Sequence, residues 1–146
     1  MKPLQEKATS YRERWLFFWM PLLAYCVLIF ALSAQSKAIS APGIPSGDQL
    51  LHVIQYSILG FLMARAIFSV HPPRSKGVLL VVSIILSMLF AFSDEIHQYF
   101  VPGRTWSVAD VMADGVGALV GTMSYWGLTL TRNGFFNGSQ KNITNA

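Results

Sequence analysis

The chain of 146 residues has room for one domain, and 12% of its residues are charged, against roughly 25% in soluble domains. With 53% hydrophobic residues, a soluble chain of this length would leave much apolar surface in water, so a soluble fold is excluded and a membrane protein is predicted. The net charge of +4 comes from basic residues that form no stripe, which argues against nucleic-acid binding.

Four apolar segments follow one another along the chain, each close to the roughly 20 residues that span a bilayer as a helix. They cover Trp15–Ser33, Gln49–Val70, Gly77–Asp94 and Val108–Leu130, and prolines and glycines separate them. The pattern predicts an all-α fold, a four-helix transmembrane bundle over residues 15–131. On either side we expect a basic cytoplasmic leader, residues 1–14, and a disordered cytoplasmic tail, residues 132–146, rich in Asn, Gly and Ser.

The first apolar segment shares two features with signal peptides, namely the basic leader before it and Ala31-Leu32-Ser33 near its end. Its uncharged stretch from Trp15 to Ser36 is longer than a signal core of about 7–15 residues. We therefore expect an uncleaved first helix. This segment also holds Cys26, the one cysteine of the sequence, so an intrachain disulfide is excluded.

The distribution of basic residues predicts the orientation in the membrane. Of the 11 Lys and Arg residues, Lys37 and Arg104 alone lie in the loops after the first and third apolar segments. The others lie in the leader, in or beside the second loop, and in the tail. Because cytoplasmic segments carry the excess of Lys and Arg, both termini are predicted to be cytoplasmic, and the first and third loops to face outward.

Two of the apolar segments begin with sequences typical of a helix N-terminus. Ser46 stands three residues before Gln49, and Ser107 three residues before Asp110, as in a capping box. Asp48 and Asp110 fall in the first turn, where the helix dipole favours negative charge. Both helix starts are predicted on the same side of the membrane.

Ionisable residues of three predicted helices gather at this same side. The uncharged run Gly77–Ser93 measures about 25 Å at about 1.5 Å per residue, whereas the hydrocarbon core is about 30 Å thick. Asp94 is therefore expected at or inside the membrane boundary. By the same reasoning Asp110 and Asp114 lie near the boundary on the fourth helix, and His52 on the second.

Helical periodicity places these residues in one stripe on each of three helices. The stripes are Asp48, His52, Gln55 and Leu59; Ser83, Ser87, Asp94 and Gln98; and Asp110, Asp114, Gly117 and Gly121. Because ionisable groups at membrane depth face the bundle interior or a wet cavity, the stripes predict a polar pocket that opens outward. The alternative is that polar residues only join the helices, each contributing less than about 1 kcal/mol. Gln55, Tyr56 and Ser87 fit either interpretation, and His97 also fits an interfacial position.

Small residues form a seam on the fourth predicted helix. Gly117 and Gly121, together with Ala113, have the spacing typical of a close approach between membrane helices. The spacing leaves open whether the partner is another helix of the chain or a second copy, in a homodimer through Gly117 and Gly121.

The run from Ser93 to Asp110, SDEIHQYFVPGRTWSVAD, resembles the VanZ-like family, whose pattern is S-D-E-x-x-Q-x-F-x-P-x-R-x-x-S-x-x-D followed by a glycine-bearing helix. The upstream run Asp48–Gly60 is similar to the family's D-K-x-x-H-x-x-x-Y-x-x-L-G element. Two residues depart from the pattern, since Gln49 stands where Lys is usual and Asp114 where Asn is common. The resemblance implies a multi-pass protein of the bacterial inner (cytoplasmic) membrane, in a family named for low-level resistance to the glycopeptide teicoplanin. It implies no particular reaction.

Three functions fit the predicted pocket, and the first is an enzyme that acts on an anionic or isoprenoid-linked lipid of the cell envelope. Arg104 lies beside two helix N-termini, and both features suit a phosphate. The candidate catalytic residues, as general acids and bases, are Asp94, Glu95, Asp110 and His52. The candidate ligand-binding residues are Arg104, Asp48, Gln98, Tyr56 and Asp114. A divalent cation bridging Asp94, Glu95 and Asp110 to the phosphate is compatible with these carboxylates, although the sequence contains no known metal-binding motif and leaves the cofactor undetermined.

The second function is non-catalytic, either binding of a lipid or glycopeptide-related headgroup or an accessory role beside proteins of an envelope or exopolysaccharide export system. The third is a small transporter, since acidic residues with His relay protons. It ranks last, because the cluster lies at one end of the bundle and not at the midplane. Membrane lipids are the expected partners, and the residues leave open whether the protein is an enzyme.

Overall fold

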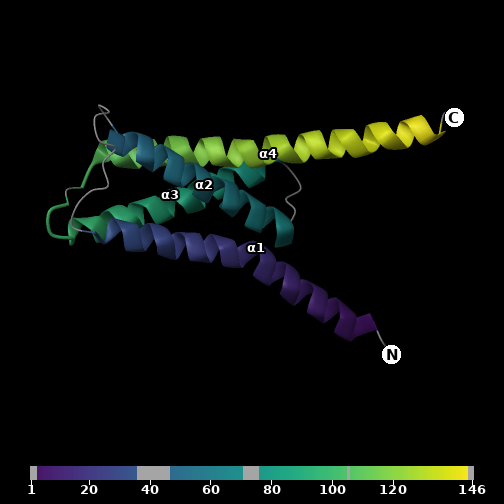
Figure 1. The fold of residues 1–146 in the computed structure, drawn as a ribbon, viewed down its shortest axis with the longest axis horizontal. Helices are drawn as coiled ribbons and strands as arrows, with labels where there is room; N and C mark the ends of the chain where they lie inside the picture. Colours follow the sequence, from purple (N-terminus) through teal and green to yellow (C-terminus); the bar gives the residue numbers. More distant parts are fainter. Residues whose placement is uncertain (1–2, 36–46, 71–75, 105, 145–146) are drawn as a thin grey trace.

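The computed structural model describes the backbone of residues 3–35, 47–70, 76–104 and 106–144, and the side chains of residues 13, 15–35, 47–69, 77–104 and 106–129. Over this part of the chain the fold is all-α, as predicted, and consists of four helices (Figure 1). The helices are α1 (Pro3–Ser33), α2 (Gly47–Val70), α3 (Lys76–Tyr99) and α4 (Val108–Thr144).

Three of the helices are long and apolar enough to cross a membrane, which makes the chain a multi-pass membrane protein. The spans are Trp15–Ser33, Gly47–Ser69 and Gly77–Tyr99, with mean hydropathies of 2.2, 1.5 and 2.2. The described part of α4 contains no such span, and Asp110 and Asp114 lower the hydropathy of its first half. That α4 also crosses the membrane, and that both termini are cytoplasmic, stay predictions.

Two helices are longer than the apolar segments that predict them. The helix α1 begins at Pro3 and so includes most of the basic leader; proline is well suited to the first helical turn. The helix α4 continues to Thr144, so its backbone is helical over residues 132–144, where the composition predicts a disordered tail. No proline follows Pro102 in the sequence, and nothing therefore removes a backbone hydrogen bond from this stretch.

The helix α2 packs against α1, α3 and α4, and its contact with α4 is the most extensive between any two helices. Its approach to α4 depends on glycine: a Cβ atom on Gly117 would lie 2.5 Å from the Val53 carbonyl oxygen, and one on Gly121 would overlap the Ser57 carbonyl. The small-residue seam predicted on α4 is thus a site of close helix approach. Its partner in this structure is α2 of the same chain, against which both glycines are buried. The homodimer considered above stays a prediction.

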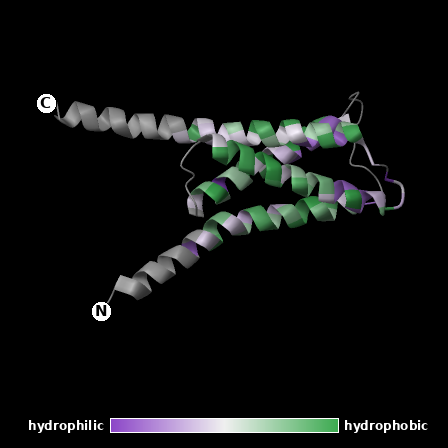
Figure 2. Cartoon of the chain, turned by 180° about the vertical axis from the view of Figure 1, so that it is seen from behind, coloured by the Kyte–Doolittle hydropathy of each residue, from purple (hydrophilic) through white to green (hydrophobic). Residues whose placement is uncertain are grey.

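The apolar core and the polar residues occupy different parts of the bundle. The core is formed by α1, α2 and α3 and contains Leu22, Ile29, Tyr56, Leu59, Met63, Ala66 and Ala91. Figure 2 shows the hydrophilic residues concentrated at the end of the bundle where α3 ends and α2 and α4 begin. The predicted gathering of polar residues at one end of the helices is therefore present in the structure.

Candidate functional site

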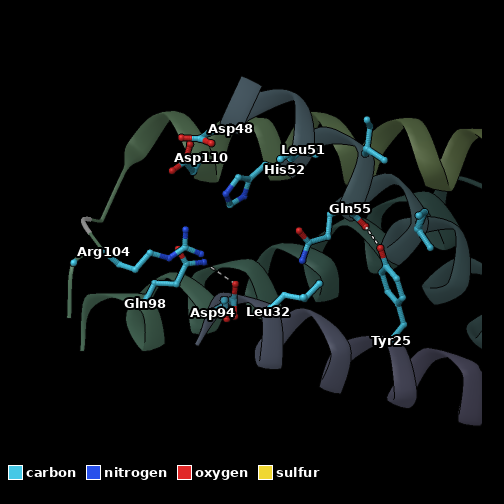
Figure 3. A pocket seen from close by; sticks show the side chains of 14 residues that line it. Tyr25, Leu32, Asp48, Leu51, His52, Gln55, Asp94, Gln98, Arg104 and Asp110 are labelled. Carbon is cyan, nitrogen blue, oxygen red and sulfur yellow. Dashed lines mark hydrogen bonds between the residues drawn. The ribbon is translucent and has the colours of Figure 1, made fainter. Parts of the chain in front are cut away.

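A cavity of about 360 Å³ lies at this polar end of the bundle. Its walls come from α1, α2, the end of α3, the turn that follows α3, and the first turn of α4 (Figure 3). The polar residues that line it are Ser33, Asp48, His52, Gln55, Asp94, Gln98, Arg104 and Asp110. The others are Tyr25, Leu32, Leu51, Ile54, Ile58 and Gly103.

Asp94 is held in the cavity wall by hydrogen bonds to both of its carboxylate oxygens. The Ser33 hydroxyl donates to Oδ1 at 2.6 Å. The Gln98 amide donates to Oδ2 at 2.9 Å (Figure 3). Gln98 stands one turn after Asp94 on α3, where side chains four residues apart are neighbours. Ser33 comes from the end of α1, so the carboxylate connects two helices while its side chain is almost fully buried.

The turn after α3 carries Arg104 to the cavity. Backbone bonds from Phe100 N to His97 O (3.0 Å) and from Arg104 N to Val101 O (3.1 Å) close the end of the helix and the turn. Between them Gly103 has φ 84°, a left-handed conformation that favours glycine. Figure 3 shows the Arg104 side chain extending into the cavity beside Gln98.

The Arg104 side chain has an unsatisfied donor. Its Nε is buried and has no hydrogen-bond partner, and no carboxylate among the described residues forms an ion pair with it. A guanidinium group presents several donors in a plane that matches the oxygens of a carboxylate or a phosphate. Arg104 is therefore available to an anion in the cavity.

The opposite wall is formed by the first turns of α2 and α4, which bring Asp48 and Asp110 together (Figure 3). The Gln49 amide donates to Asp110 Oδ1 at 3.4 Å, so the residue that departs from the family pattern contacts one of the site's carboxylates. Ser107 caps α4 as predicted, because its hydroxyl accepts from Asp110 N at 3.3 Å. The reciprocal bond differs from a capping box, since Ser107 N donates to Glu95 Oε2 at 3.3 Å. The predicted cap at Ser46 lies outside the described residues.

A second group of ionisable side chains lies where α2, α3 and α4 converge. His52 Nδ1 is 2.8 Å from Asp114 Oδ1, although the two residues are 62 positions apart in sequence. Glu95 completes the group, and one potential ligand atom from each of the three residues lies within 4.8 Å of the others. Glu95 and Asp114 are each 1% exposed.

The structure places six of the nine predicted site residues on the cavity wall, namely Asp48, His52, Asp94, Gln98, Arg104 and Asp110. The other three, Tyr56, Glu95 and Asp114, do not line it and are buried. The positions of these nine residues do not test the catalytic and ligand-binding roles assigned to them, and those roles stay predictions. His97, which also fits an interfacial position by sequence, stacks on Phe30 with ring centroids 4.0 Å apart.

The suggested cation bridge through Asp94, Glu95 and Asp110 does not form a compact group among the described residues. Asp94 and Glu95 are adjacent on α3, and neighbouring residues on a helix point about 100° apart. Asp94 accordingly contacts α1 through Ser33, whereas Glu95 contacts the start of α4 through Ser107. Helix phase separates two carboxylates that the sequence places side by side.

Sequence reasoning missed the contribution of α1 to the site. Tyr25 and Ser33 both line the cavity, and the Tyr25 hydroxyl donates to the Gln55 carbonyl oxygen at 3.1 Å. The first helix has no Asp, Glu, His, Lys or Arg in its apolar part and no motif that would single these two out. The one usable signal was that Ser33, at the end of the first span, falls on the same membrane side as Asp94.

The cavity extends from the charged end to the outer surface of α2. Ile54 and Ile58 line it, yet they are also 51% and 44% exposed. In a membrane protein, exposed apolar side chains along a span face lipid. One cavity therefore touches both the polar interior at Arg104 and the exposed apolar surface of α2.

Acidic residues are concentrated at this end of the bundle. Asp48, Asp94, Glu95, Asp110 and Asp114 are five of the seven acidic residues of the chain. Among the described residues at this end, Arg104 is the one Lys or Arg, and the one ion pair joins His52 to Asp114. An anionic group that reaches Arg104 therefore also meets carboxylates, and its binding is favoured by any further cation that joins it.

Comparison with known families places the chain in one of them. The VanZ/LLP1 family matches the chain over residues 8–131, a stretch that contains the cavity and both groups of ionisable residues. The comparisons with curated proteins and with solved structures found no match. The chain belongs to the VanZ/LLP1 family.

Proposed function

We propose that the protein binds the phosphate-bearing headgroup of an anionic or isoprenoid-linked cell-envelope lipid in this cavity and acts on it. The observation that carries the proposal is the lining of the cavity, which passes from the unpaired Arg104 to the exposed Ile54 and Ile58. A soluble substrate needs no such apolar side. An amphiphilic lipid needs a polar site for its headgroup and an apolar surface for its chains, and this cavity offers the two together.

The polar end offers groups for both binding and proton transfer. Arg104 is suited to hold phosphate oxygens by charge-assisted hydrogen bonds. His52 lines the cavity and contacts Asp114 through Nδ1, which leaves Nε2 as the ring nitrogen for a proton transfer. A carboxylate that orients a histidine in this way is a common support for a general base. Asp110 lies across the cavity as the second acid–base group.

The test compares the membrane lipids of cells that carry the wild type, Arg104→Ala, or Asp94→Asn, by mass spectrometry of lipid extracts. The matched control is Arg65→Ala, which removes an arginine at the other end of α2, where it packs over the Phe17 and Phe18 rings. We expect one lipid species to change with the wild type and with the control, and to stay at the level of cells lacking the protein in the two site variants. Identical lipid profiles in all strains, at equal protein abundance, would refute an enzymatic function.

One observation favours a non-catalytic alternative, in which the protein binds a headgroup or assists an envelope or exopolysaccharide export system. Both oxygens of Asp94 are already engaged by Ser33 and Gln98, as expected of a carboxylate that holds helices together. Under this alternative a phosphate-bearing lipid co-purifies with the wild type and is lost from Arg104→Ala, while the lipid profile of the cells is unchanged.

A further inference from the structure

We infer that His52, Glu95 and Asp114 bind a divalent transition-metal cation, of the Zn²⁺ or Mn²⁺ class, beside the cavity. The inference goes beyond the proposed lipid function and does not depend on it. Each of the three residues comes from a different helix, α2, α3 and α4, and one potential ligand atom of each lies within 4.8 Å of the others. Bonds of about 2.0–2.2 Å from nitrogen and oxygen to Zn²⁺ make such a group closable by small side-chain movements.

An independent observation at Glu95 points to a ligand. The residue is 1% exposed, and its Oε2 accepts a hydrogen bond from Ser107 N. Its other oxygen, Oε1, is buried and has no hydrogen-bond partner among the described residues. Burial of a carboxylate oxygen without a hydrogen-bond partner costs free energy, and such oxygens are rare in native proteins. A cation held by this carboxylate would remove the cost.

The group contains two carboxylates but only one histidine to balance their charge. The contact between His52 and Asp114 accounts for one carboxylate, and only if the histidine is protonated does it supply a positive charge. Glu95 is left as a second buried acid with no ion pair to any described Lys, Arg or His. A divalent cation balances two carboxylates at once, which a neutral or protonated histidine does not.

The donor atoms indicate which cations fit. One imidazole and two carboxylates favour Zn²⁺, Mn²⁺ or Fe²⁺ over Ca²⁺, which prefers an all-oxygen shell of six to eight ligands. Thiolate is not part of the group, since Cys26 lies on α1. Three protein ligands also leave coordination positions open, and His52 borders the cavity. A cation here would add the positive charge that a phosphate in this acidic cavity requires. With the cation bound, His52 would be a ligand and no longer a general base, and Asp110 would remain as the acid–base group of the cavity.

The experiment uses the full-length protein, purified in detergent and stripped of metal. Co²⁺, added as a spectroscopic probe, is titrated by its visible absorption, and Zn²⁺ and Mn²⁺ are then measured by competition. We expect one cation per chain in the wild type, and affinity lower by at least about tenfold in Glu95→Gln and in Asp114→Asn. The matched controls are Asp48→Asn and Asp94→Asn, which change two carboxylates that line the adjacent cavity and lie outside the group. Both should keep the wild-type affinity.

The unfolding temperature provides a second measurement of binding. Zn²⁺ should raise the unfolding temperature of the wild type and of both controls, but not of Glu95→Gln, which separates lost binding from a lost fold. Absence of binding in the wild type, or an equal loss in group and control variants, would overturn the site.

The Arg104→Ala variant distinguishes the two proposals: it should lose the effect on lipids and retain the cation. If the wild type binds the cation but leaves the lipids unchanged, the site stands and the lipid function fails.

Discussion

Asp94 illustrates what an ionisable residue needs in order to sit at the end of a membrane helix. Its side chain is 2% exposed, and burial of a carboxylate without partners is costly. The Ser33 hydroxyl and the Gln98 amide donate to its two oxygens, so neither oxygen lacks a partner. The same two bonds attach the end of α1 to α3, and a residue placed by sequence in the catalytic group therefore also has a structural role.

We predict that Ser33→Ala destabilises the fold by about 1–3 kcal/mol, because it leaves one oxygen of a buried carboxylate without its donor. Reversible unfolding in mixed micelles measures the change. Ser124→Ala serves as the control: its hydroxyl bonds only to the Val120 carbonyl of its own helix and is exposed, so its loss should change the stability by less than about 0.5 kcal/mol. Equal effects of the two substitutions would contradict the role given to Ser33.

At the scale of the elements, glycines determine how α4 lies on α2. Gly117 and Gly121 meet backbone atoms of α2, and Gly60 of α2 meets the backbone of Ala118 in return. With no side chains between them, the two backbones approach closely, and the Thr122 hydroxyl reaches the Gly60 carbonyl oxygen at 3.3 Å. This approach also brings Asp114 next to His52, so the seam positions the buried ionisable group.

A methyl group in this seam should therefore separate the helices. We predict that Gly121→Ala lowers the stability by about 1–3 kcal/mol, the usual cost of overpacking, because its Cβ would overlap the Ser57 carbonyl. The control on the same helix is Gly127→Ala, whose Cβ meets nothing within 4 Å and should be neutral or slightly stabilising. Unfolding of the two variants side by side checks the prediction, and an undisturbed Gly121→Ala would show that the helices do not approach so closely.

On the scale of the whole molecule, the ionisable residues that are buried or line the cavity occupy one end of the bundle, and the positive-inside rule predicts that this end faces outward. Figure 1 shows the first residues of α1 and the last residues of α4 at the opposite end. We therefore predict that the cavity opens toward the outer leaflet, where envelope lipids carry their external headgroups.

Cysteine labelling tests this orientation. In a Cys26→Ser background, Trp106→Cys places a thiol on the exposed turn before α4, and Gly77→Cys places one on the exposed start of α3 at the other end. We predict that a membrane-impermeant maleimide labels Trp106→Cys in intact cells and labels Gly77→Cys only after permeabilisation. The reverse pattern would place the cavity on the cytoplasmic side and exclude an outer-leaflet substrate.

The sequence by itself determined the features that depend on local chemistry. Hydropathy is a property of each segment alone, so the helices and the membrane location could be read from composition. The positions of Asp94, Asp110, Asp114 and His52 near one end follow from counting residues along each helix. The cap at Ser107 also depends on neighbouring residues only.

The tertiary structure decided which of these residues meet, because helix packing fixes how each helix is rotated about its axis. Adjacent in sequence, Asp94 and Glu95 point to different neighbours, whereas His52 and Asp114 meet across 62 positions. Packing also brought Ser33 to Asp94 and exposed the apolar side of the cavity at Ile54 and Ile58. Periodicity assigns residues to a face of a helix, but only the contacts between helices, here set by glycines that let α4 touch α2, decide what that face meets.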